Sequence, residues 1–237
     1  MRFPLRFRPF ASLFTVAALG VLIGLGSWQL DRREWKLDLI ATIEARLQAP
    51  PLGVIFPDQL DPEKLDFLED RRTKVVGMPD YDKELYLHAI GPDGKPGVHV
   101  IVPVMQYTST VLFDRGFVPI DLKNPAKRPK GQIDKILQNG VIRNNQQPGL
   151  FTPPNEPQNN LWYYRDWQAM ADAMGLDKSR VLPFIVEADA TPNPGGVPLG
   201  GQTRVEIKND HLEYALTWFG LALTLLGVFL AFSWKKD

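Results

Sequence analysis

Two long apolar segments lie at the ends of the chain, and the polar sequence lies between them. Residues 9–30 carry no charged side chain, and neither do residues 214–234. At about 1.5 Å per residue, a helix of about 20 residues spans the roughly 30 Å hydrocarbon core of a bilayer. The pattern therefore predicts transmembrane helices over residues 10–30 and 214–234.

The first apolar segment has a second interpretation, a secretory signal peptide, because arginines precede it. It is longer than a usual signal core, however, and no A-x-A-like cleavage site follows it. Large side chains instead continue at helical spacing, at Trp28, Arg32, Trp35, Leu39 and Ile43. We therefore favour a membrane helix that extends through residues 31–47 and ends before two consecutive prolines.

Short runs rich in β-branched and aromatic residues follow, which predict strands. They cover residues 73–78, 84–90, 98–107, 110–119, 134–143, 181–188 and 203–208. The turn GPDGKPG at 91–97 predicts a hairpin, residues 165–174 form a helical pattern, and 52–72 look like a short helical excursion. The fold class is therefore a membrane α+β protein, with two transmembrane helices flanking one antiparallel-rich β domain. Its sheet is expected to be strongly curved or partly closed.

The distribution of charged residues predicts the orientation of the chain in the membrane and excludes some functions. Basic residues precede the first span and follow the second, so residues 1–9 and 235–237 are expected in the cytoplasm and 31–213 outside it. The segment 31–213 holds 22 basic and 26 acidic residues, a net charge of −4, without the basic stripe of a nucleic-acid binder. The absence of cysteine excludes disulfides, thiolate metal sites and iron–sulfur clusters.

His211, one of three histidines, is the leading candidate for chemistry. In a helix that begins near Asp210, it would share a face with Tyr214, Ala215 and Trp218. A neutral imidazole at this place could ligate a haem iron, and Arg32 could hold a haem propionate. An ordinary belt of interfacial aromatic residues would explain the same pattern, and spacing alone favours that belt.

Other motifs indicate no catalysis. The glycine-rich segment 195–201 lacks the Gly-Lys-Ser/Thr of a phosphate-binding loop and leads toward a predicted strand. His88 and His99 could approach across the hairpin, but a third metal ligand is missing nearby. No serine occupies a nucleophile elbow. We therefore predict no enzyme, and no polar pocket of converging titratable groups in the β domain.

Several blocks resemble the surfeit locus protein 1 family of cytochrome oxidase assembly factors. They are GLGSWQLDRREWKLDLI at 24–40, DRGFVP at 114–119, NNLWYYRDWQAMA at 159–171 and PGGVPLGGQTRVEIKNDHLEYALTWF at 194–219. The resemblance implies a multi-pass inner-membrane protein. Its main domain would face the periplasm in a bacterium, or the protein would lie in the mitochondrial inner membrane of a eukaryote. Without a long transit peptide in the Arg6–Arg8 region, a bacterial member is expected.

The resemblance also implies a function, assembly of an aa3-type cytochrome c oxidase by binding haem a at the outer membrane face and assisting its insertion into subunit I. Carried over by motif, the haem-iron ligand would be His211. The cofactor-binding set would be His211, Arg32, Trp28, Gln29, Trp35, Tyr214, Thr217 and Trp218. Partners would be subunit I, a haem a synthase and membrane lipid. Two alternatives are a cofactor-free scaffold for an oxidase intermediate and an envelope enzyme or solute-binding module.

Overall fold

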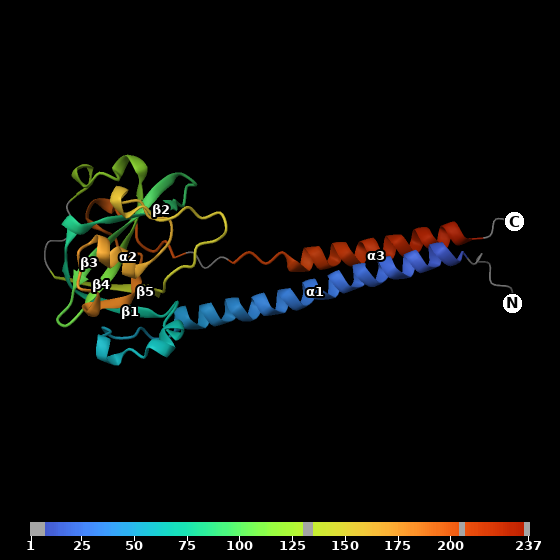
Figure 1. Ribbon diagram of the computed structural model, residues 1–237, viewed down its shortest axis with the longest axis horizontal. Coiled ribbons are helices and arrows are strands. Elements are labelled where there is room, and N and C mark those ends of the chain that lie inside the picture. The colour runs from blue at the N-terminus through green and yellow to red at the C-terminus, as the bar shows by residue number, and fades with distance from the viewer. Residues whose placement is uncertain (1–7, 130–134, 204–206, 235–237) are drawn as a thin grey trace. The chain divides into compact units, whose positions relative to one another are not determined.

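The computed structural model describes residues 8–129, 135–203 and 207–234 (Figure 1). The chain divides into a helical unit, residues 1–44 and 205–237, and a β unit, residues 45–204. Two helices, α1 (Pro9–Gln48) and α3 (His211–Ser233), are long and apolar enough to cross a membrane. Helix α1 covers both the predicted first span and its extension through residue 47. The terminal bases used for the topology, apart from Arg8, lie outside the described residues.

Small side chains line the contact between the helices of the helical unit. The buried residues are Thr15 and Gly26 in α1 and Ala215, Ala222 and Ser233 in α3. A Cβ atom on Gly26 would lie 2.5 Å from the ring of Phe219, so a larger residue at this position would displace that ring. Arg8, just before α1, stacks over Phe232 near the C-terminal end of α3. The start of α1 therefore lies beside the end of α3, and the two helices are antiparallel. Small residues that permit close backbone approach are typical of helix pairs in membranes.

The β unit contains a closed five-stranded barrel with one additional strand. The strands are β1 (Arg72–Pro79), β2 (Leu85–Ile90), β3 (Pro96–Met105), β4 (Thr110–Pro119), β5 (Ile136–Arg143) and β6 (Val181–Ala188). Their order is β1-β5-β6-β4-β3-β2, and a further pairing of β1 with β3 closes the ring. All pairs are antiparallel except β4–β6. The predicted fold class and curvature are confirmed.

Two apolar layers hold the barrel together, one on each face of its sheet. Alternate residues such as Val100, Val102 and Phe113 fill the interior, which all five barrel strands contribute to. The residues between them, such as Ile101 and Leu112, pack outside under Trp162 and helix α2 (Trp167–Ala173). Burial on both faces explains why β3 and β4 are apolar at nearly every position.

The predicted strand at 203–208 is not observed in the described part of that segment. Residues 204–206 lie outside the described residues, and Thr203, Ile207 and Lys208 belong to no strand. Among the described residues, Gly201 makes the last backbone hydrogen bond to the barrel before α3, to the carbonyl of Ala188. The alternating pattern of this segment suits a strand, but its described residues pair with no neighbouring strand.

Candidate functional site

Helix α3 begins at His211, where the sequence predicted its start. The His211 Nδ1 atom lies 2.6 Å from the Oε1 atom of Gln29 in α1. An amide oxygen only accepts hydrogen bonds, so Nδ1 is the donor, and in the neutral imidazole Nε2 then keeps its lone pair. Within the described part of the chain, Nε2 has no hydrogen-bond partner. Metal-ligating histidines generally have this arrangement, because a carbonyl or carboxylate holds the other ring N–H.

A second contact places the start of α3 against the same face of α1. The side-chain amide of Asn209 donates to the backbone carbonyl of Arg33 over 3.4 Å. Arg33 lies one helical turn after Gln29, so both contacts occur on one face. On α3, Ala215 is one turn beyond His211 and is buried. The imidazole is thus held at a fixed place beside the helix contact.

The other predicted residues lie mainly away from this contact. The exposed fractions of Trp28, Trp35 and Tyr214 are 52%, 51% and 57%. The Arg32 guanidinium stacks over the Trp35 ring at 4.3 Å from its centre. The predicted stripe on α1 is helical, but it does not line the contact with α3. Arg32 covers one face of the Trp35 ring, and the exposed Trp28 ring is open to a planar ligand or to lipid.

The remaining two predicted residues lie on α3. The Thr217 hydroxyl donates to the carbonyl of Glu213 within the helix over 2.9 Å, and Thr217 is exposed. Trp218 is half-buried one turn after Ala215, toward α1. Of the predicted set, the structure therefore brings Gln29 and His211 into direct contact and leaves Thr217 pointing away.

A polar row crosses the outer face of the barrel. His99 in β3, Asp114 in β4, Glu187 in β6 and Arg143 in β5 come from four neighbouring strands. With Arg165 and other residues, these four line a pocket of about 400 Å³. The prediction that the β domain lacks converging titratable groups is therefore wrong. The available signal was the presence of titratable side chains, such as His99, Asp114 and Glu187, inside strands that are otherwise largely apolar.

The row contains a histidine–carboxylate pair. The His99 Nδ1 atom lies 2.7 Å from Asp114 Oδ2, and the Asp114 side chain is 2% exposed. Burial lowers the pKa of His99, but the charge and hydrogen bond of Asp114 outweigh it, so the pKa is raised above its ordinary value. On the neighbouring strand, Glu187 accepts from Arg165 at 2.9 Å and from the Thr203 hydroxyl at 2.7 Å.

The predicted proximity of His88 and His99 across the hairpin yields no metal site. In the β2–β3 register, His88 is opposite Val98, and His99 is opposite Leu87. The His88 ring instead lies 5.9 Å from the ring of Tyr163. Among the described residues, no three histidine, cysteine or carboxylate side chains form a group that could hold a metal ion.

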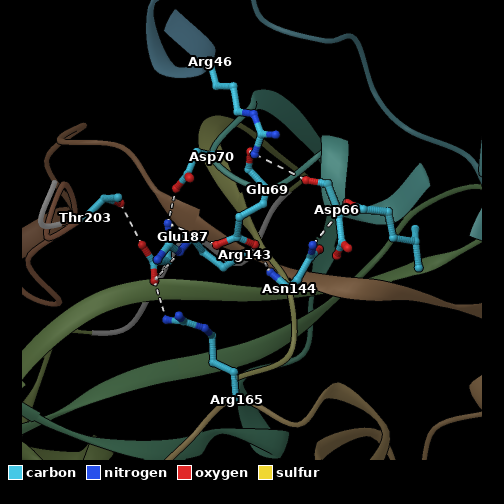
Figure 2. A network of polar contacts seen from close by, with 10 residues as sticks. Arg46, Asp66, Glu69, Asp70, Arg143, Asn144, Arg165, Glu187 and Thr203 are labelled. Carbon is cyan, nitrogen blue, oxygen red and sulfur yellow. Dashed lines mark hydrogen bonds and ion pairs between the residues drawn. The ribbon is translucent and has the colours of Figure 1, made fainter. Parts of the chain in front are cut away.

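Polar contacts extend from this row to both chain connections of the β unit (Figure 2). Arg143 pairs with Asp70 and, at 3.3 Å, with Glu69. The carbonyls of Asp66 and Glu69 accept from Arg46, near where the chain enters the unit. Glu187 accepts from Thr203, near where the chain leaves it. The network therefore joins the entry and exit segments to the barrel wall.

Comparison with known proteins identifies the family. The model of the SURF1 family matches residues 16–223. Surfeit locus protein 1 of Mus musculus is 38% identical over 229 residues, covering 90% of this chain and 72% of the relative. The Homo sapiens protein is 38% identical over 217 residues, covering 84% and 69%. The Takifugu rubripes protein is 34% identical over 245 residues, covering 96% and 98%. The resemblance is confirmed, and the chain belongs to the SURF1 family.

Proposed function

We propose that this protein assists assembly of an aa3-type cytochrome c oxidase by binding haem a at the outer membrane face and assisting its insertion into subunit I. The proposed role in oxidase assembly rests on membership of the SURF1 family, whose members are known as cytochrome c oxidase assembly factors. The haem role rests on one observation, the His211 imidazole whose Nδ1–H is held by Gln29. Its Nε2 atom is then the available ligand for iron.

The membrane topology belongs to the same proposal. Helices α1 and α3 each cross the inner membrane, with the β unit in the periplasm of a bacterium and both termini in the cytoplasm. The basic residues at the two termini support this orientation. In a eukaryotic cell the equivalent place is the mitochondrial inner membrane. His211, at the start of α3, then lies at the outer, periplasmic surface of the inner membrane.

The predicted cofactor-binding residues would hold the haem as cargo and not as a catalytic group. His211 would ligate the iron, and Gln29 would fix the orientation of its ring. Arg32 would pair with a propionate, and Trp28 would contact the porphyrin, together with Trp35, Trp218 and Tyr214. An exposed site with one protein ligand suits a carrier, because the cargo must be released to subunit I. A haem a synthase is the expected donor.

The test is the haem content of the purified protein. Full-length wild type and His211→Ala would be purified in mild detergent from cells that make haem a, and the pigment would be extracted. His88→Ala is a matched control, because His88 is an exposed histidine in the β unit. We expect haem a in wild type and His88→Ala and its loss in His211→Ala. Wild-type haem content in His211→Ala would refute the ligand assignment.

The exposed aromatic stripe favours a second candidate, a scaffold that holds an oxidase intermediate without a cofactor. Trp28 and Trp35 are both more than half exposed, as anchors in lipid or contacts to another membrane helix would be. The same purification distinguishes the two functions. A colourless wild type that copurifies with subunit I, from cells shown to contain haem a, would favour the scaffold.

A further inference from the structure

The loop after β5 presents two large apolar side chains to solvent. Residues 144–155 contain no charged residue, and they form a yellow loop that projects from the barrel in Figure 1. At its tip, Leu150 and Phe151 are 92% and 93% exposed. Single exposed apolar residues are ordinary on protein surfaces, but adjacent ones at a loop tip form a patch that indicates a binding partner.

Hydrogen bonds restrain the loop at its tip and at both ends. At the tip, Thr152 N donates to the Gly149 carbonyl, and Gly149 N donates to the Thr152 hydroxyl, both over 3.0 Å. At the base, Gln146 N donates to the carbonyl of Arg165 over 2.9 Å. The C-terminal end of the loop is held at Asn155, whose side-chain oxygen accepts a hydrogen bond from Tyr163 N over 2.8 Å. A loop fixed in this way loses little conformational entropy when its tip is bound.

The base of the loop joins the network that reaches both chain connections of the β unit (Figure 2). Asn144, the first loop residue, donates its backbone N–H to Glu69 over 2.5 Å, and the carbonyl of Glu69 accepts from Arg46. Arg143, just before the loop, is 3.7 Å from Glu187, which accepts from Thr203. The loop therefore leaves the barrel beside the segments that connect it to the apolar helices.

We propose that Leu150 and Phe151 insert into the lipid interface, so that the loop is a third membrane attachment beside the two spans. Tyr163 and Tyr164, at its base, are of a residue type enriched at membrane–water interfaces. Two side chains offer far less area than the roughly 800 Å² per partner of a standard protein interface, which argues against a protein occupant. Anchoring by two spans makes the insertion intramolecular, so a small apolar tip is sufficient.

The chain's lack of cysteine permits a direct experiment on the full-length protein. Phe151→Cys would be labelled with an environment-sensitive fluorophore and reconstituted into vesicles of phosphatidylcholine and phosphatidylglycerol, some carrying a nitroxide quencher high on the acyl chain. Leu137→Cys is the matched control, because Leu137 is a similarly exposed apolar residue, with 73% of its surface exposed. It lies in β5 about 20 Å from Arg143, the residue just before the loop, so its label would be far from the loop. We expect quenching at position 151 to exceed that at position 137 several-fold.

Equal, weak quenching at both positions would overturn the proposal. A label at position 151 that stays in water in vesicles but becomes protected when oxidase subunit I is added would also overturn it, and would assign the tip to a protein. Leu150→Ser with Phe151→Ser should abolish the attachment but leave the haem content of the protein unchanged. This inference needs the membrane spans and not haem binding, so its failure is distinguishable from failure of the His211 test.

Discussion

Replacing Gln29 by leucine would test whether the contact with His211 serves ligand binding. The two side chains have similar volumes, so the helix contact around Gly26 and Ala215 should persist. What the substitution removes is the acceptor 2.6 Å from His211 Nδ1. The imidazole could then rotate and exchange its tautomers, and its Nε2 atom would no longer be presented in one orientation.

The expected magnitude follows from the lost hydrogen bond. A neutral hydrogen bond contributes a net of about 1 kcal/mol, which is near fivefold to tenfold in a dissociation constant. Removal of the outer partner of a metal-ligating histidine typically weakens metal binding about 10-fold to 100-fold. We therefore expect the Kd for haem to rise by about 10-fold or more in Gln29→Leu, and to change less in Gln29→Glu, which keeps an acceptor.

The assay is titration of haem onto the haem-free protein in detergent, followed by the Soret absorption. Gln48→Leu is the control, since it is the same substitution at the last residue of α1. An unchanged Kd in both leucine variants would refute the reasoning, because it would show that the Gln29 contact does not prepare His211 as a ligand. Equal weakening in both would indicate a general effect on α1.

Two further predictions concern the barrel. The Glu84 side chain is 7% exposed and pairs with Arg115 at 3.7 Å and with Arg128 at 2.5 Å. Because Glu84→Gln would leave these buried cations unpaired, it should lower the free energy of unfolding in urea by about 3–5 kcal/mol. A loss under about 1 kcal/mol would contradict the role of this ion cluster. The pKa of His99 is raised by Asp114, so its contribution to stability is complete below the unfolded pKa and is lost as pH rises through the folded pKa. Unfolding free energies measured from pH 6 to 9 should fall in wild type and fall less in His99→Gln, and identical slopes would contradict this.

The elements of this protein follow from local patterns in its sequence. Two uncharged segments of membrane-spanning length predict α1 and α3, and the pattern continuing to residue 47 predicts the extension of α1. Runs of β-branched residues between glycine and proline turns predict the six strands of the β unit. Such patterns are reliable because periodicity and turn chemistry act between residues close in sequence.

Tertiary structure decided which elements became neighbours. Gln29 contacts α3 through His211, whereas its neighbour Trp28 is 52% exposed, and the helical spacing of the sequence does not choose between them. The polar row depends on strand order, because the parallel pairing of β4 with β6 sets Asp114 opposite Glu187. These residues are 73 positions apart, and their separate apolar strands contain no local signal that they meet. Pairing across such separations is a property of the whole packed barrel, so only the folded chain determines it.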